Sequence, residues 1–177
     1  MRRVSPAVAL AAIAILTAGV ARAAQPTPVP DAKPDLSSLS FLLGTWACHS
    51  VARGSPRPDT TTFTMDYDGH WMRSHDVAPP FDRYRTRPIV SDSWISFNPI
   101  VRVWVQTEVD NFGGYGTSTA PGWRGNTMTW TAVATPDGST GTDVFTKVSE
   151  TQTKDVFAGR DKNGRPLPAT TTVCTKR

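Results

Sequence analysis

The stretch Phe41–Cys48 (Phe-Leu-Leu-Gly-Thr-Trp-Ala-Cys) decides the fold, because it joins a short apolar turn to the first of many strand-like runs. Asp35 can cap a short helix over Leu36–Leu43. Gly44 can end that helix, and Thr45–Val51 then predicts a strand. The pattern predicts a short N-terminal helical plug at the base of a barrel.

The chain begins with the features of a secretory signal. A charged start is followed by the apolar run Ala7–Val20, which is shorter than the roughly 20 residues that cross a bilayer as a helix. Ala21–Ala23 (Ala-Arg-Ala) has the form of a cleavage site. We therefore predict a bacterial signal peptide over residues 1–23, a mature protein that starts at Ala24, and a periplasmic or secreted location.

Removal of this peptide changes the charge of the protein. The peptide contains Arg2, Arg3 and Arg22 and no acid, so subtracting three charges from the formal net charge of +4 leaves +1. A charge this small gives no support for a nucleic-acid partner. No later apolar run is long enough for a membrane helix.

The remaining chain forms one leader and one predicted domain. Residues 24–35 are rich in proline, which predicts an extended leader, and residues 36–177 are expected to form a single domain. After Gly44 the sequence consists of strand-like runs between turn signals such as Asp68-Gly69. About eight to ten such runs with hairpin-like connections predict an all-β fold, a single antiparallel up-and-down barrel.

The two cysteines lie in the first and last predicted strands. Closing a barrel brings these strands together, so Cys48 and Cys174 can form a disulfide in an exported protein. Such a bridge would stabilise the fold by about 4–5 kcal/mol in the chain-entropy model. The alternative is two separate buried thiols.

The motif Gly44-Thr45-Trp46 resembles the G-x-W start of the lipocalin and wider calycin barrels. A longer series of turns and tryptophans is similar to the bacterial secreted lipocalin-like proteins of unknown function. This series consists of Trp94–Pro99, Val103–Val105, Asp110–Tyr115, Gly122–Asn126 and Trp130. The resemblance covers Leu39 to Lys176 and implies a closed barrel with a plugged bottom and an interior cavity. It implies no particular chemistry.

Alternation along the strands suggests which side chains line the interior. In Val101–Val109 the valines occupy one face, which we expect to be the core, and Trp104 shares the other face with Gln106 and Glu108. The candidate ligand-binding residues are Trp46, Phe63, Met65, Val103, Val105 and Trp130. Few charges are expected on these faces, so the expected ligand is a small apolar or amphipathic molecule.

The long segment Ala78–Val90 has two interpretations. It is either a solvated loop or a lid at the barrel mouth that attracts an acidic head group. The candidate portal residues are Arg83, Tyr84 and Arg85.

The sequence predicts no catalytic, metal-binding or cofactor-binding residues. The three histidines show no metal-ligand spacing. Haem-carrying calycin relatives, the nitrobindin-like barrels, have a first strand richer in glycine than Ala47-Cys48-His49. His75 and Asp76 alternate on a strand and are expected to be a surface pair.

The function favoured by these features is an exported, non-enzymatic barrel that binds a small, mainly apolar ligand. Two alternatives remain. A small hydrolase or isomerase would be indicated by a buried histidine or carboxylate with a shifted pKa. An envelope interaction module would be indicated by an interior too full for any ligand.

Overall fold

The computed structural model describes residues 33–52, 55–80 and 86–177, and within these it contains almost no helix. One antiparallel sheet of 11 strands has the order β6-β5-β4-β3-β2-β1-β11-β10-β9-β8-β7. The strands are β1 (Gly44–Ala52), β2 (Ser55–Asp66), β3 (Trp71–Ala78), β4 (Ile89–Asn98), β5 (Val103–Asp110), β6 (Tyr115–Ala120), β7 (Trp123–Arg124), β8 (Thr127–Ala134), β9 (Thr140–Ser149), β10 (Gln152–Arg160) and β11 (Thr170–Lys176).

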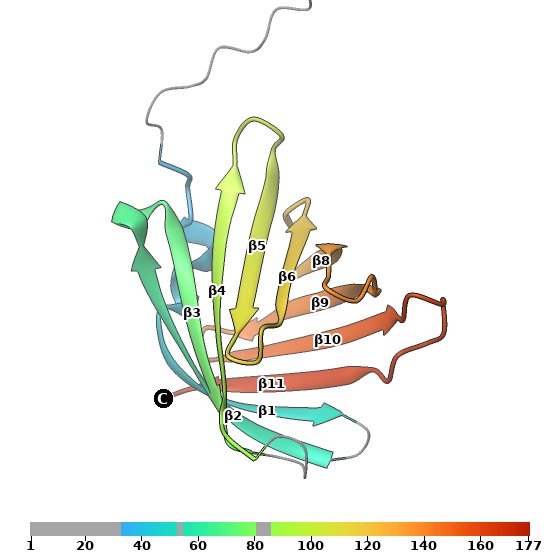
Figure 1. Ribbon diagram of the computed structural model, residues 1–177. Helices are drawn as coiled ribbons and strands as arrows, with labels where there is room; N and C mark the ends of the chain where they lie inside the picture. The colour runs from blue at the N-terminus through green and yellow to red at the C-terminus, as the bar shows by residue number, and fades with distance from the viewer. Residues whose placement is uncertain (1–32, 53–54, 81–85) are drawn as a thin grey trace, which may run out of the picture.

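The sheet closes on itself because β6 also pairs with β8. The two-residue strand β7 pairs only with β8, so the other ten strands form the barrel wall (Figure 1). Most neighbours in the barrel are also neighbours in sequence, as expected for hairpin connections. The predicted all-β antiparallel barrel is confirmed.

Strands β1 and β11 lie side by side and join the two ends of the chain (Figure 1). Cys48 faces Cys174 directly in their register. The two residues form a disulfide across 126 positions of sequence, with their Cα atoms 4.0 Å apart. The predicted bridge is therefore present, and the alternative of two separate thiols is wrong.

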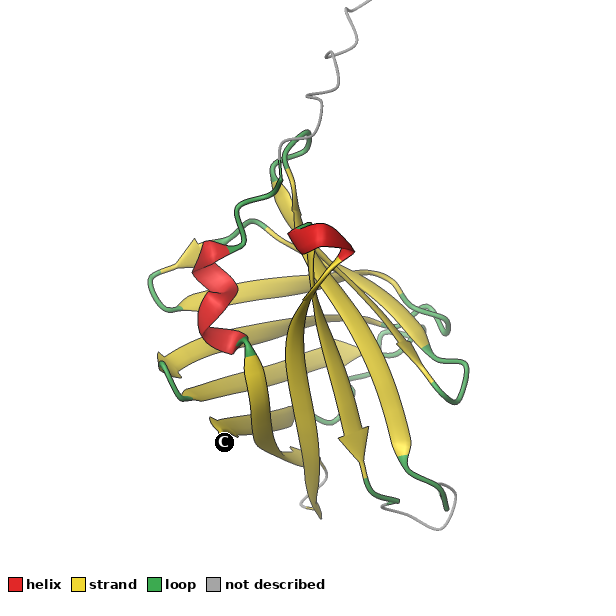
Figure 2. Cartoon of the chain, turned by 90° about the vertical axis from the view of Figure 1, so that its left-hand side faces the viewer, coloured by secondary structure: helices red, strands yellow, loops and turns green. Residues whose placement is uncertain are grey.

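A short helix precedes the first strand. The 3-10 helix η1 (Ser37–Leu42) lies at one end of the barrel (Figure 2). Its side chains Leu39 and Leu42 are buried. The helix is therefore shorter than the predicted range Leu36–Leu43. It is a 3-10 helix, which is wound more tightly than an α-helix. Gly44 follows with a φ of 111°, a conformation that residues other than glycine rarely adopt. This glycine lets the chain turn from η1 into β1.

The second short helix, η2 (Tyr67–Gly69), forms the turn between β2 and β3. Its last residue, Gly69, has a φ of 81°, as the Asp-Gly turn signal predicted.

The apolar core lies at the end of the barrel next to η1. Its buried residues are Leu36, Leu39, Phe41, Leu42, Trp46, Cys48, Met72, Ile95, Trp104, Ala120, Met128 and Trp130. Trp46 is completely buried, and its indole N–H donates to the Leu42 carbonyl. Among the residues that the structure describes, no helix is long and apolar enough to cross a membrane.

Candidate functional site

The interior of the barrel, here called the lumen, contains a cavity of about 240 Å³. Its inner side is formed by a group of apolar side chains that we call the apolar floor. The apolar floor consists of Leu39, Leu42, Trp46, Phe63, Ile95, Met128, Trp130 and Phe145. Leu39 and Leu42 come from η1, so this helix supplies part of the surface.

Beyond the apolar floor the lumen becomes acidic. Five carboxyl side chains, the carboxylate belt, project into it from β2, β3, β5, β9 and β10. They are Asp59, Asp76, Glu108, Asp143 and Asp155. All except Glu108 line the 240 Å³ cavity. Glu108 lines an adjoining cavity of about 290 Å³, to which Asp59 and Asp76 also contribute.

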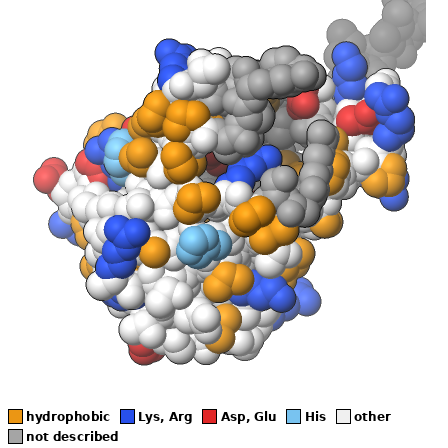
Figure 3. Space-filling view, turned by 90° about the horizontal axis from the view of Figure 1, so that it is seen from below, with side chains coloured by type: hydrophobic (Ala, Val, Ile, Leu, Met, Phe, Trp, Pro, Cys, Tyr) orange, Lys and Arg blue, Asp and Glu red, His pale blue; other side chains and the backbone are white. Residues whose placement is uncertain are grey.

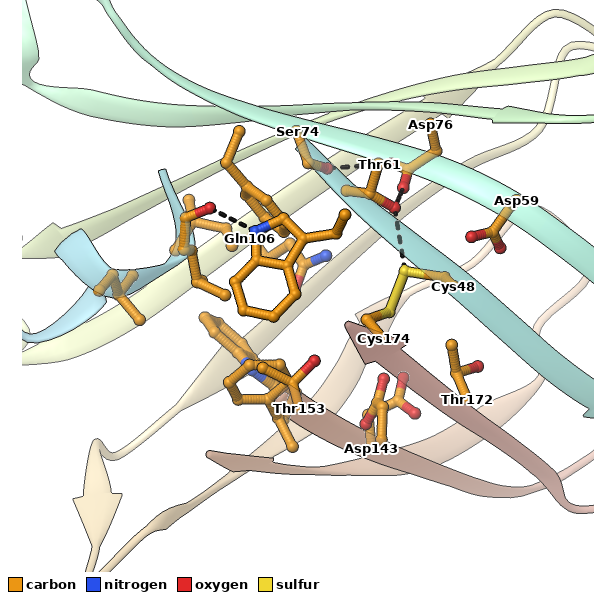
Figure 4. Close-up of a pocket in the computed structure, with 18 of the residues that line it drawn as sticks. Cys48, Asp59, Thr61, Ser74, Asp76, Gln106, Asp143, Thr153, Thr172 and Cys174 are labelled. Atoms are coloured by element: carbon orange, nitrogen blue, oxygen red, sulfur yellow. Dashed lines mark hydrogen bonds between the residues drawn. A yellow bond between two sulfur atoms is a disulfide. The ribbon is translucent and has the colours of Figure 1, made fainter. Parts of the chain in front are cut away.

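The belt lies on both sides of the disulfide-linked strands. Figure 4 shows Asp59 and Asp76 on one side of the Cys48–Cys174 bond and Asp143 on the other. Between them, the hydroxyls of Ser50 and Thr172 are hydrogen-bonded at 2.8 Å across β1 and β11. These side chains also line the cavity.

Burial raises the pKa values of the carboxyl groups in the lumen, and neighbouring negative charges add to this effect for some of them. Burial and the charge of Asp143 raise the pKa of Asp155 to about 7. Burial and the charge of Asp76 raise the pKa of Asp59 to about 6. Burial alone raises the pKa of Asp143. At neutral pH the belt therefore carries fewer negative charges than its composition suggests.

Glu108 is repelled by carboxylates on both sides of the belt. Burial raises its pKa to about 7, and the charges of Asp76, Asp110 and Asp143 contribute in that order. Its side chain nevertheless remains accessible to water. Water weakens these repulsions for Glu108 more than for Asp155, which is less exposed.

Two members of the belt have an unpaired oxygen. Oδ1 of Asp59 and Oδ1 of Asp155 are buried and accept no hydrogen bond from the described residues. Asp76 differs, because it accepts hydrogen bonds from the hydroxyls of Thr61 and Ser74. Burial nevertheless outweighs these bonds and raises the pKa of Asp76. The lumen thus offers acceptors that the described protein groups leave unused.

Three of the predicted ligand-binding residues, Trp46, Phe63 and Trp130, line the cavity. Met65 does not, because it lies near the end of β2 and is 43% exposed. Whether any of these residues contacts a ligand stays a prediction.

The predicted orientation of β5 is wrong. Gln106 lines the cavity and Trp104 is buried against Phe97, with ring centroids 5.6 Å apart. Val103 and Val105 therefore lie on the outer face of the strand. The error has a physical cause: both faces of β5 are partly apolar, and a barrel tolerates scattered methyl groups outside while a large indole fills the inside.

The remaining predicted features lie elsewhere. Arg83, Tyr84 and Arg85 fall outside the described residues, so the portal stays a prediction. His75 does lie on the outer face, where Nδ1 is 2.9 Å from Asp92 Oδ1, and Arg73 pairs with the same carboxylate. Asp76 is not its surface partner, because it points into the lumen. Among the described residues, no three His, Cys, Asp or Glu side chains are arranged to hold a metal ion.

Sequence reasoning missed the carboxylate belt, although a signal for it exists. Each acid alternates with an inward-facing apolar or polar residue on the same strand, as in Asp143-x-Phe145 and Trp104-x-Gln106-x-Glu108. Residues i and i+2 of a strand share a face. An inward-facing aromatic residue therefore indicates that an acid two positions away also faces the interior. The expectation of few charges on the interior faces is wrong.

No protein-family model and no curated protein matches the sequence. Among solved structures, the S-type phycobiliprotein lyase of Guillardia theta aligns with a TM-score of 0.56 over 80% of this chain and 91% of the lyase, at 9% identity. A redesigned β-barrel aligns with a TM-score of 0.43 over 78% of this chain and 93% of its own, at 17% identity.

A protein of unknown function from Nostoc punctiforme, of the DUF3598 family, aligns with a TM-score of 0.46 at 11% identity. It is matched over 78% of this chain but only 49% of its own length. The likeness to the lyase is in the arrangement of the fold. At such low identity it shows the fold alone.

Proposed function

We propose that this protein is an exported, non-enzymatic, lipocalin-like barrel that binds a small molecule in its lumen, with η1 as the plug. The observation that carries the proposal is the hollow interior bounded by the apolar floor. Its 240 Å³ exceed the roughly 150 Å³ of an apolar cavity that accommodates benzene. The adjoining cavity at the carboxylate belt extends this space.

Several features support export and a small ligand in place of a macromolecule. The N-terminal signal features and the disulfide suit an oxidising compartment outside the cytoplasm. In the view from below, apolar and basic side chains are interspersed on the described part of the surface (Figure 3). No large patch of one kind gathers there, as an extended docking face would require.

The test is binding of a neutral, apolar fluorescent naphthalene probe to the mature protein and to two matched variants. Gln106→Phe places a large ring in the cavity, whereas Val109→Phe adds the same ring on the outer face of the same strand. We expect the wild type and Val109→Phe to bind the probe and to quench tryptophan emission, and Gln106→Phe to lose binding. Equal binding by all three proteins would place the probe outside the lumen and contradict the proposal.

A cavity-based hydrolase or isomerase is the second candidate. The observation that favours it is the raised pKa of Asp155, about 7, because a general acid or base works best near the operating pH. An enzyme would turn over a bound ester or ketone, and Asp155→Asn would abolish turnover while binding remained. Unchanged substrate after prolonged incubation with saturated protein would count against this candidate.

A further inference from the structure

We infer that the lumen selects a cationic amphiphile, a molecule with a small apolar body and one protonated amine. This inference rests on the proposed function, since it names the chemical class of the ligand that the cavity would bind. It arises from the way in which the apolar floor and the carboxylate belt adjoin within one cavity.

The two surfaces meet at β8 and β9. Trp130 of the apolar floor faces Asp143 of the belt directly in the register of these strands. Phe145, the next inward residue of β9, faces Asp155 in the register of β9 and β10. Paired residues on one face of a sheet have side chains about 4.5–5.5 Å apart at Cβ. An apolar body stacked on Trp130 would therefore place an attached amine beside Asp143 and Asp155.

Two oxygens of the belt are left without a hydrogen-bond partner among the described groups. Oδ1 of Asp155 and Oδ1 of Asp59 accept no hydrogen bond there, and a buried unpaired carboxylate is unfavourable. The lumen can reduce this unfavourable free energy in two ways, by taking up protons or by taking up a cation. The raised pKa of Asp155 is the signature of the first, and an ammonium group that donates up to three hydrogen bonds supplies the second.

An organic cation fits this cavity better than the alternatives. A carboxylate ligand would add a further negative charge next to Asp76, Asp143 and Asp155 and would be repelled. A metal ion would leave the apolar floor uncovered, and the described acids are not arranged as a metal site.

Calorimetric titration with three probes that share a naphthyl ring tests the inference. The probes are naphthylmethylamine, naphthylmethanol and naphthoate, measured near neutral pH, with Ca²⁺ alone as a fourth titrant. The amine is expected to bind about tenfold more tightly than the alcohol, because its hydrogen bonds to carboxylates are charge-assisted. Naphthoate should bind most weakly.

Variants assign the preference to the belt. The double variant Asp143→Asn, Asp155→Asn should remove the advantage of the amine while the affinity for the alcohol is retained. Glu150→Gln removes a negative charge at an exposed position, where Glu150 pairs with Lys147, and should leave the preference unchanged. Retained binding of the alcohol by the double variant also shows that this variant is folded.

The outcomes separate the two claims. If all three naphthyl probes bind equally, or naphthoate binds best, the cationic specificity is wrong and the lumen still binds small molecules. If Ca²⁺ binds and displaces the amine, and the naphthyl ring adds nothing to the affinity, the belt is a metal site and the inference fails. If no naphthyl probe binds, the proposed function fails and the inference fails with it.

Discussion

The indole N–H of Trp46 donates a 2.6 Å hydrogen bond to the carbonyl oxygen of Leu42. This bond ties the first strand to η1. Lys176, in the last strand, lies over the same indole at 5.6 Å and donates a 2.8 Å hydrogen bond to the Phe41 carbonyl. Both ends of the domain therefore converge on one tryptophan.

Trp46→Ala should destabilise the domain by about 3–5 kcal/mol, because it empties a fully buried site and removes the bond to η1. Urea unfolding followed by circular dichroism measures the change. Trp71→Ala, at a half-buried position in β3, provides the control and should cost clearly less. Equal losses in the two variants would show that Trp46 has no special structural role.

The disulfide should contribute strongly to stability because it closes a long loop. Replacing both Cys48 and Cys174 by serine is expected to lower the free energy of unfolding by about 4–5 kcal/mol in the chain-entropy model. Peptide mapping without reductant should recover the two cysteine peptides as one linked species. Complete labelling of both thiols in the folded protein would contradict this expectation.

The carboxylate belt predicts an unusual dependence of stability on pH. Burial, followed by like charges, raises the pKa of Asp59 to about 6 and that of Asp155 and Glu108 to about 7. Burial also raises the pKa of Asp76 and Asp143. Between the ordinary values near 4 and these raised values, the folded state holds protons that the unfolded chain has lost. Stability should therefore fall as the pH rises through this window.

Thermal unfolding at several pH values measures this effect. The melting temperature should be higher near pH 5 than near pH 8. Carboxyls with lowered pKa values, such as Asp161 with its hydrogen bonds from Arg165, act in the opposite direction but only below about pH 4. A melting temperature that rises steadily from pH 5 to pH 8 would show that ionisation of the belt does not destabilise the folded protein.

Asp155→Asn should stabilise the protein at neutral pH. The substitution removes a buried charge whose Oδ1 has no hydrogen-bond partner among the described residues. A gain of about 1 kcal/mol would raise the melting temperature by about 2–4 °C in a domain of this size. Asp161→Asn is the matched control and should give no gain, because Asp161 forms an ion pair with Arg165. A loss of stability in Asp155→Asn would mean that its carboxylate is held by a favourable partner.

Export gives a prediction that does not depend on the ligand. Protein recovered from the periplasm or the medium of a bacterial culture should have an N-terminus at Ala24, since Ala21–Ala23 has the form of a cleavage site. Intact-mass spectrometry measures this directly. Exported protein that retains residues 1–23 would contradict it.

The barrel could be predicted because local signals and global topology agree. Asp68-Gly69 specifies the β2–β3 turn, and Thr127–Ala134 alternates cleanly over the length of β8. The disulfide followed from the requirement that the first and last strands meet. The turn and the alternation depend on short-range geometry, which a sequence records well, and the disulfide depends only on closure of the barrel.

The candidate site was harder to predict because the two faces of a barrel strand differ less than expected. In β5 the valines are β-branched and suit either face, whereas the burial of Trp104 depends on Phe97 in the next strand. The acids of the belt come from five strands, and only the register brings them together. Their repulsion is a property of the assembled lumen.

The central claim is that the lumen holds a small molecule, and a crystal structure of the mature protein soaked with naphthylmethylamine tests it most directly. The account predicts density for the naphthyl ring against Trp130, with the amine within hydrogen-bonding distance of Asp143 or Asp155. Density for the ring only in the outer groove of Tyr67, Trp71 and Trp94, or a lumen filled by protein side chains, would contradict it.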